Sequence, residues 1–167
     1  TIELEFSVGD EGLFMIRGAV AADCCIELER TVRRTSGAFS MFYVVDGGAP
    51  ADVVELATRT PSVEHCRVVS RDETGDAGLI EVTVQTWFGS VFTDHGAVVR
   101  RATAERGVGS IVVEAPRGAN VRQLVEGFRE QYPAVELVAQ RQRERTIHSL
   151  FELQDVLQEE LTDRQWE

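Results

Sequence analysis

Apolar and polar residues alternate over several short stretches of the chain, and this period of two is typical of strands with one buried face. Near the N-terminus, for example, Ile2, Leu4 and Phe6 alternate with Glu3 and Glu5. Other stretches repeat apolar residues at spacings of three and four, which predicts amphipathic helices. Strands are expected at residues 2–8, 25–33, 39–45, 63–70, 79–87, 97–106, 110–115 and 135–140, and helices at 13–23, 51–60, 90–95 and 119–132.

The order of these elements is strand, helix, strand, strand, helix, strand, and the same order then occurs a second time. Short sequence matches accompany the repeat. Asp52 and Asn120 hold the same place at the start of the second helix of each copy, where either side chain would cap the helix. Residues 60–64 resemble residues 132–136 at the turn into each last strand. The chain is therefore expected to contain an internal duplication.

Two copies of this order predict an α+β fold of tandem ferredoxin-like (βαββαβ) units with antiparallel sheets, each sheet carrying two helices on one face. The first unit is expected at residues 1–72 and the second at 79–145, because the polar, glycine-containing stretch 72–78 separates them. The two sheets would pair either edge to edge or face to face, and the pattern leaves both arrangements open.

A further helix is predicted after the second unit, because apolar residues recur from Ile147 to Leu161 over a face wider than a surface helix needs. We expect residues 146–161 to form a linker helix. It would either dock on the body of the protein or pair with its copy in a second chain.

The final residues, LTDRQWE, carry the signals of a helix start. Thr162 and Gln165 have the spacing of a capping box, and Leu161 and Trp166 occupy the two positions of a hydrophobic staple. Either these residues form a frayed tail, or residues 162–167 are the first turn of a further domain.

The composition is acidic, with a formal net charge of -11, and all 17 basic residues are Arg. Abundant carboxylates without Lys resemble the proteins of extreme halophiles, which stay soluble in molar salt because charge repulsion is screened. A GC-rich bacterial genome would also favour Arg over Lys. The acidic balance argues against nucleic-acid binding by these residues alone, since duplex binding depends on cationic side chains.

The chain has no apolar run long enough to span a membrane and no signal-peptide pattern at its start. A cytoplasmic location and no membrane partner are therefore expected. The odd number of cysteines fits reduced thiols, as in cytosolic proteins.

No residues are expected to serve as catalytic, cofactor-binding or metal-binding groups. The cysteines and histidines lack the spacing of a metal site, and His65 and Cys66, as adjacent strand residues, would face opposite sides of a sheet. The glycines lack the pattern of a phosphate-binding loop. Buried thiols and ordinary turns are the simpler interpretation. The soft ligands considered are Cys24, Cys25, Cys66, His65, His95 and His148.

The densest basic positions lie near the ends of the two matching hairpins. One interpretation is an anion or partner patch formed by Arg33, Arg34, Arg100 and Arg101. The neighbouring glutamates favour the alternative, solvated and ion-paired strand faces.

The terminal LTDRQWE resembles the first turn of the C-terminal helix-turn-helix in haloarchaeal regulators similar to the bacterio-opsin activator, whose DNA-binding module characteristically begins L-T-x-x-Q. The preceding residues resemble the domain that comes before that module, at residues 22–30, 61–64 and 95–100. The terminal motif is the specific part of this resemblance, and the remainder is a pattern over most of the chain.

The resemblance implies that the chain is a non-enzymatic sensory or assembly domain of a transcription regulator. The DNA partner would be bound by the missing helix-turn-helix and not by this fragment, and helix 146–161 would transmit a change in packing to it. A homodimer and an unknown small-molecule effector stay open as partners. The alternative is a stand-alone small-molecule-binding or dimerisation domain without a DNA role.

Overall fold

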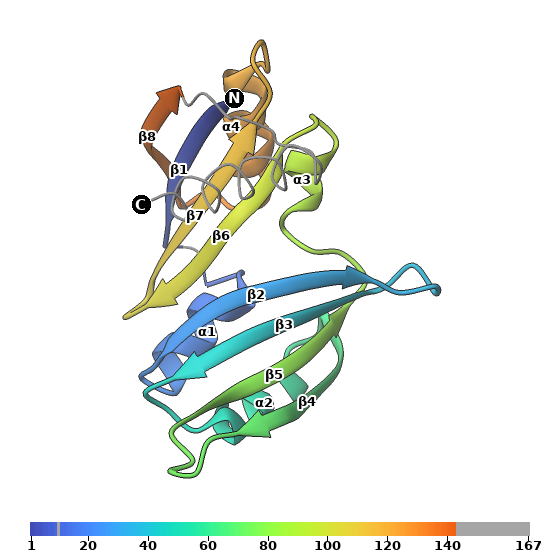
Figure 1. Cartoon of the computed structure of the whole chain (residues 1–167), viewed down its shortest axis with the longest axis vertical. Helices are drawn as coiled ribbons and strands as arrows, with labels where there is room; N and C mark the ends of the chain where they lie inside the picture. The colour runs from blue at the N-terminus through green and yellow to red at the C-terminus, as the bar shows by residue number, and fades with distance from the viewer. Residues whose placement is uncertain (10, 143–167) are drawn as a thin grey trace, which may run out of the picture.

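The computed structural model describes residues 1–9 and 11–142, and this part of the chain forms an α+β fold (Figure 1). The predicted linker helix and the predicted helix-turn-helix start at Leu161, Thr162, Gln165 and Trp166 lie outside the described residues. The order of elements expected from the sequence is confirmed. The elements are β1 (Ile2–Val8), α1 (Phe14–Ala21), β2 (Cys25–Arg33), β3 (Phe39–Asp46), α2 (Pro50–Thr58), β4 (Val63–Arg71), β5 (Ala77–Val84), α3 (Ser90–Thr93), β6 (Val98–Glu105), β7 (Val108–Ala115), α4 (Val121–Gln131) and β8 (Val135–Gln142).

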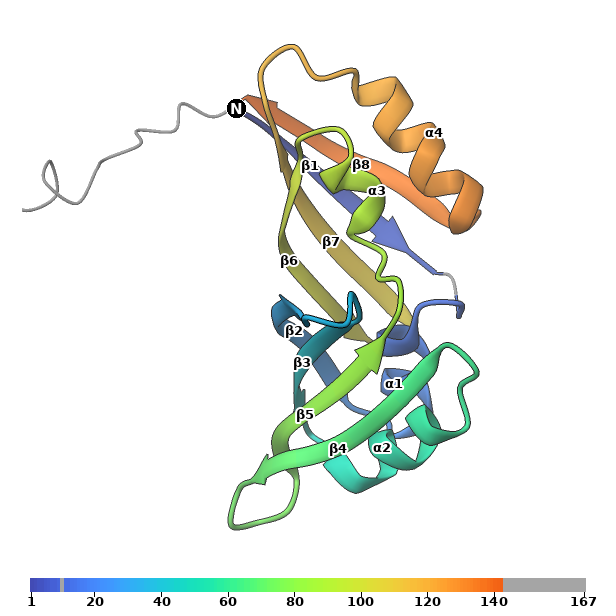
Figure 2. The same ribbon diagram turned by 90° about the vertical axis from the view of Figure 1, so that its right-hand side faces the viewer.

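These strands form an eight-stranded antiparallel sheet in the order β4-β5-β3-β2-β6-β7-β1-β8. The four helices lie on one side of the sheet (Figure 2). The hairpins expected from the sequence, β2–β3 and β6–β7, are both present. The two halves of the sheet join edge to edge through β2 and β6, over only three residue pairs.

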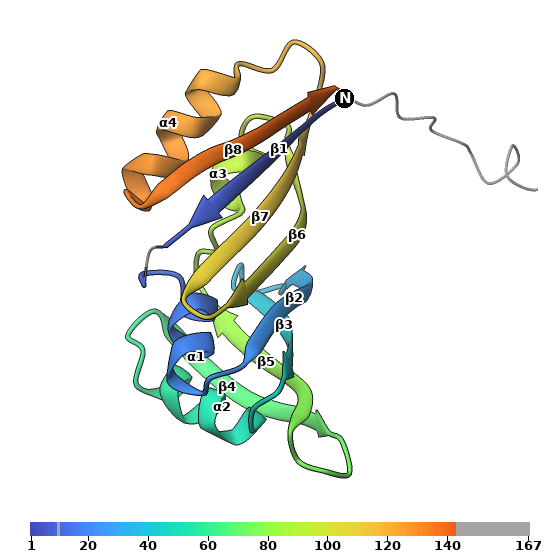
Figure 3. The same cartoon turned by 90° about the vertical axis from the view of Figure 1, so that its left-hand side faces the viewer.

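The first strand of each sequence repeat lies in the other half of the sheet. β1 pairs with β7 and β8 (Figure 3), and β5 pairs with β3 and β4. One half, which we call the inserted half, is therefore continuous in sequence from α1 to β5. The other, which we call the split half, consists of β1 together with the elements from α3 to β8.

The expected tandem ferredoxin-like units are not confirmed in the form predicted. A unit confined to residues 1–72 would contain β1 but not β5, whereas the sheet groups β5 with β2, β3 and β4. The physical reason lies in the pattern itself. β1 and β5 both alternate buried apolar residues with residues on the opposite face, so the sequence does not say which sheet each strand completes.

The exchanged strand β1 is anchored in an aromatic core. The ring of Phe6 lies 5.6 Å from the ring of Phe92 in α3 and 5.5 Å from that of Phe128 in α4, measured between centroids. All three side chains are fully buried. Burial of three aromatic rings is a large apolar contribution to folding, so removing β1 would dismantle this core.

Helix α1 belongs to the inserted half but also contacts β6 and β7 of the split half. The contact is close, because a Cβ atom built on Gly109 in β7 would lie 3.0 Å from Ile16 Cδ1. Gly18 has the same role within the inserted half, where a Cβ would lie 2.9 Å from Ile26 Cδ1. Glycine at these two positions therefore allows α1 to pack against both halves.

The two predicted helix caps have different outcomes. Asn120 caps α4, since its Oδ1 accepts a hydrogen bond from the Gln123 backbone N–H at 3.2 Å. The prediction for Asp52 is wrong, because α2 begins at Pro50, after Ala49. Proline is pre-organised for the first helical position, and Asp52 falls within the first turn, where the helix dipole favours a carboxylate.

Candidate ligand site between the two halves of the sheet

The site begins where strands β2 and β6 separate. Their pairing ends at Glu27 and Thr103. Next to that point β2 has a register shift against β3, between Leu28 and Arg30. Strand β6 has a corresponding shift against β7, between Val99 and Arg101. A β-bulge bends its strand and increases the local twist, so the two irregularities account for the divergence of β2 and β6.

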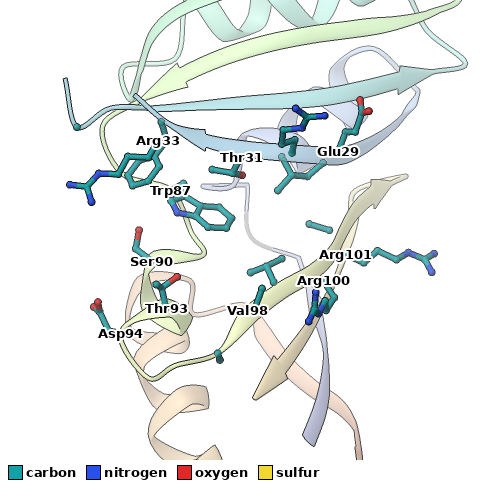
Figure 4. A pocket seen from close by; sticks show the side chains of 17 residues that line it. Glu29, Thr31, Arg33, Trp87, Ser90, Thr93, Asp94, Val98, Arg100 and Arg101 are labelled. Carbon is teal, nitrogen blue, oxygen red and sulfur yellow. The ribbon is translucent and has the colours of Figure 1, made fainter. Parts of the chain in front are cut away.

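A cavity of about 690 Å³ lies between the diverging strands (Figure 4). Its walls come from β2, the start of β3, the segment before α3, α3 itself and β6. The volume is within the range of small-molecule sites. The residues that line it are Leu28, Glu29, Arg30, Thr31, Arg33, Gly37, Phe39, Trp87, Ser90, Thr93, Asp94, Ala97, Val98, Val99, Arg100, Arg101 and Ala102.

One wall is aromatic. The ring centroid of Trp87 lies 6.4 Å from that of Phe39 and 5.3 Å from that of the buried Phe88. The indole occupies the space above Gly89, where a Cβ atom would come within 2.1 Å of the ring. Trp87 is half-buried and extends into the gap between β2 and β6 (Figure 4). The wall therefore offers an aromatic surface whose position depends on glycine at residue 89.

The charged groups of the cavity have a positive excess, although the whole chain has a net charge of -11. Four arginines line it, against the carboxylates of Glu29 and Asp94. Arg100 Nε is 2.5 Å from Glu114 Oε2 in β7. Among the described residues, Arg33 and Arg101 form no ion pair.

The structure brings three residues of the predicted basic patch to this cavity and leaves the fourth outside it. Arg33 lies at one end and Arg101 at the other, with Arg100 below β2 on the opposite strand (Figure 4). Arg34 does not line the cavity.

Arg34 acts instead on Glu81 in β5. Burial tends to raise the pKa of this carboxyl. Hydrogen bonds from Arg67 and Ser40 lower it, as do the positive charges of Arg67 and Arg34. These groups outweigh burial, so the pKa lies below its ordinary value. The Arg67 Nε donates to Glu81 Oε1 at 2.8 Å. The positive charge of Arg34 therefore acts on the inserted half and not in the cavity.

Thr31 adds a polar group to the cavity wall. Its Oγ1 atom is buried, and no described residue provides it with a hydrogen bond. A buried hydroxyl without a partner is uncommon in a folded protein and carries a desolvation cost.

The sequence patterns did not identify Thr31, Phe39 or Trp87 as site residues. Trp87 was expected at the end of a strand over residues 79–87, but β5 ends at Val84. The Gly89-Ser90 pair directly after the two aromatic residues is the signal that a turn begins there.

The cysteines are separate from the cavity. Burial raises the pKa of the Cys24 thiol to about 11, with smaller contributions from Cys25 and Asp23. Burial likewise raises the pKa of Cys66 to about 11. Among residues 1–9 and 11–142, no three His, Cys, Asp or Glu side chains gather in a way that could hold a metal ion. In the same part of the chain, no helix is long and apolar enough to cross a membrane.

Comparison with known proteins identifies the family. Residues 1–155 match the family BAT, described as the "GAF and HTH_10 associated domain". The chain belongs to the BAT family. The resemblance to bacterio-opsin activator-like regulators is thereby confirmed.

A curated relative agrees with this assignment. The BAT chain is 30% identical over 164 residues to a protein of Haloferax volcanii named "Putative transcriptional regulator". The alignment covers 98% of this chain and 28% of the relative, so the chain spans little more than a quarter of that protein's length. No solved structure matches the chain.

Proposed function

We propose that this BAT chain is the sensory or assembly domain of a haloarchaeal helix-turn-helix transcription regulator. The observation that carries the proposal is the family match over residues 1–155, because the family is described by its association with HTH_10 domains. The name and greater length of the Haloferax volcanii relative support it. The role is regulatory and not enzymatic.

DNA would be read outside the described residues. The net charge of -11 is unfavourable for contact with phosphates, so base recognition needs a separate module. In this proposal that module begins at Leu161 and Thr162, with Gln165 and Trp166 completing its first turn, and helix 146–161 connects it to the BAT domain. Such a protein would act in the cytoplasm.

We propose that the joint between the two halves transmits the signal. We regard the chain as two ferredoxin-like repeats that exchange their first strands, with domain bodies at residues 13–84 and at 1–9 plus 88–142. The halves share only three residue pairs between β2 and β6, and the cavity lies beside that joint. An effector in the cavity would alter the angle between the halves. A dimer would convert this change into a new spacing of two helix-turn-helix modules.

The alternative is a stand-alone small-molecule-binding or dimerisation domain without a DNA role. The cavity favours the small-molecule version of this alternative. The gene sequence beyond the codon for Glu167 separates the two functions. A stop codon there would exclude the regulator, whereas codons for a helix-turn-helix would support it.

The biochemical test is binding of the complete protein to genomic DNA fragments in molar salt. We expect site-specific binding that disappears when everything after Leu161 is deleted, while the circular dichroism of the remaining domain shows that it is still folded. Unchanged site-specific binding by the truncated protein would overturn the proposed division of labour.

A further inference from the structure

We propose that the cavity between β2 and β6 binds a planar, anionic small molecule, with an aromatic ring system and a carboxylate or phosphate group. This inference rests on the proposed sensory role and identifies the chemical class of the effector. Neither the family description nor the relative's name assigns a ligand to this position.

The aromatic wall selects a planar ligand. Trp87 is fixed from behind by Phe88 and Gly89 and from the side by Phe39, so its open face is rigid. Val98 on the opposite strand is 51% exposed and provides an apolar surface across the gap. A ring inserted between these side chains would bury apolar area on both faces, and offset stacking on an indole adds to that gain.

The arginines favour an anion. In Figure 4 the guanidinium groups of the exposed Arg33 and Arg101 extend outward from opposite ends of the cavity, so binding would require one of these side chains to turn toward the ligand. Arg33 and Arg101 have no ion-pair partner among the described residues, whereas Arg100 is already paired with Glu114. A guanidinium presents a planar fork of donors that matches a carboxylate or a phosphate. The positive excess of the lining disfavours a metal ion or an organic cation.

The exposed edges of β2 and β6 add hydrogen-bonding groups. Beyond Glu27 and Thr103 the two strands no longer pair with each other, so their facing backbone groups remain available. A ligand that forms hydrogen bonds to both edges would therefore draw the two halves together.

The test is isothermal titration calorimetry on the 167-residue chain, with two matched pairs of probes. AMP is compared with adenosine, and 2-naphthoate with 2-naphthamide, so that each pair differs only in the anionic group. Inorganic phosphate tests the anion without the ring. We expect saturable binding of AMP, of 2-naphthoate or of both, and much weaker binding of adenosine, 2-naphthamide and inorganic phosphate. Binding of AMP alone would indicate a nucleotide, and binding of 2-naphthoate alone would indicate an aromatic acid.

Arginine variants locate the site. At least one of the variants Arg33→Gln and Arg101→Gln should weaken binding of the anionic probe about tenfold or more, which is the usual scale for a hydrogen bond to a charged group. Arg71→Gln is the matched control, since it makes the same charge change at the end of β4, away from the cavity. Thr31→Val removes the unpartnered hydroxyl without losing side-chain volume. It therefore tests whether this hydroxyl contacts the ligand, and it should leave the fold intact.

Location in the cavity is checked with Trp166→Phe, which leaves Trp87 as the sole tryptophan. Bound AMP should change the fluorescence of this variant.

Three results would overturn the inference: no saturable binding by any probe, equal binding of charged and uncharged partners, or no greater weakening by either Arg33→Gln or Arg101→Gln than by Arg71→Gln. If any of these results occurs while the complete protein still binds DNA through residues beyond Leu161, the ligand class is wrong and the proposed function stands. Loss of that DNA binding would instead overturn the proposed function.

Discussion

At the scale of single residues, burial keeps two thiols protonated in the folded protein. Cys24 lies against α1, where its Sγ is 3.9 Å from the carbonyl oxygen of Gly18, and Cys66 lies in β4. Each has a pKa of about 11, against an ordinary value of 9.0, chiefly because burial penalises the thiolate. A thiol with a raised pKa is a poor nucleophile and a poor metal ligand at neutral pH, so these two residues serve packing.

These shifts predict a loss of stability at alkaline pH. Because both pKa values are higher in the folded state than in the unfolded chain, the unfolded chain releases a proton that the folded protein keeps. The stabilisation is complete below pH 9 and is lost as the pH rises through 11, by about 1.4 kcal/mol per pH unit for each thiol. Urea unfolding at several pH values between 8 and 11 measures this slope.

The double variant Cys24→Ala/Cys66→Ala is the control for that experiment. Its slope should be much smaller between pH 9 and pH 10. A smaller slope should remain, because burial also raises the pKa values of Cys25 and Tyr43. A wild-type free energy of unfolding that stays constant from pH 8 to pH 11 would contradict the assignment.

Residue chemistry was predicted well from the sequence only where neighbours along the chain decide it. The Asn120 cap is such a case, because it depends on residues three positions apart. The basic patch is different. Arg33 and Arg34 are adjacent in sequence, yet one lines the cavity and the other acts on Glu81. Their separation depends on where β2 ends and on β5, a strand that lies far away in sequence.

At the scale of elements, strand exchange is the feature that the sequence pattern could not provide. Helices and strands were located closely, because periods of two and of three to four are local properties. Whether β1 or β5 completes a given sheet depends on long-range pairing, and both strands have suitable buried faces. The bulges in β2 and β6 could not be predicted from the sequence either, because an unpaired residue in a strand changes an alternating pattern very little.

The exchange predicts which fragment of the chain folds by itself. Residues 11–85 contain α1, α2 and the four strands β2 to β5, whereas residues 1–72 lack β5 and leave β3 and β4 without their shared neighbour. In molar salt, fragment 11–85 should show cooperative urea unfolding by circular dichroism. Fragment 1–72, similar in length, should be unfolded or aggregated. Cooperative folding of 1–72 together with failure of 11–85 would contradict the strand order.

At the scale of the whole molecule, charge determines the conditions under which the fold is stable. The net charge of -11 comes from 28 acidic and 17 basic residues, and the basic side chains are all Arg. At about 0.1 M salt the Debye length is about 10 Å, so neighbouring carboxylates repel one another across the surface. At about 1 M it falls to about 3 Å, and most of this repulsion is screened.

Stability should therefore rise with salt. We expect the melting temperature to increase by at least about 5 °C between 0.1 M and 2 M KCl, which corresponds to about 2 kcal/mol for a domain of this size. Differential scanning calorimetry measures it. The control is a variant in which three exposed carboxylates, Glu73, Glu130 and Glu136, are replaced by Gln. If the variant has the same salt dependence as the wild type, charge repulsion is not the cause.

The most direct measurement of the regulatory claim is the transcript profile of cells that express the complete protein with Arg33→Gln and Arg101→Gln together. Profiles from cells with Arg71→Gln and from cells lacking the gene are measured alongside. If the domain senses an effector through the cavity between β2 and β6, the double variant should change the same transcripts as gene loss or hold their levels constant. This result is expected at wild-type protein abundance. Arg71→Gln should match the wild type. A double variant whose transcripts equal the wild type, while gene loss changes them, would contradict the account.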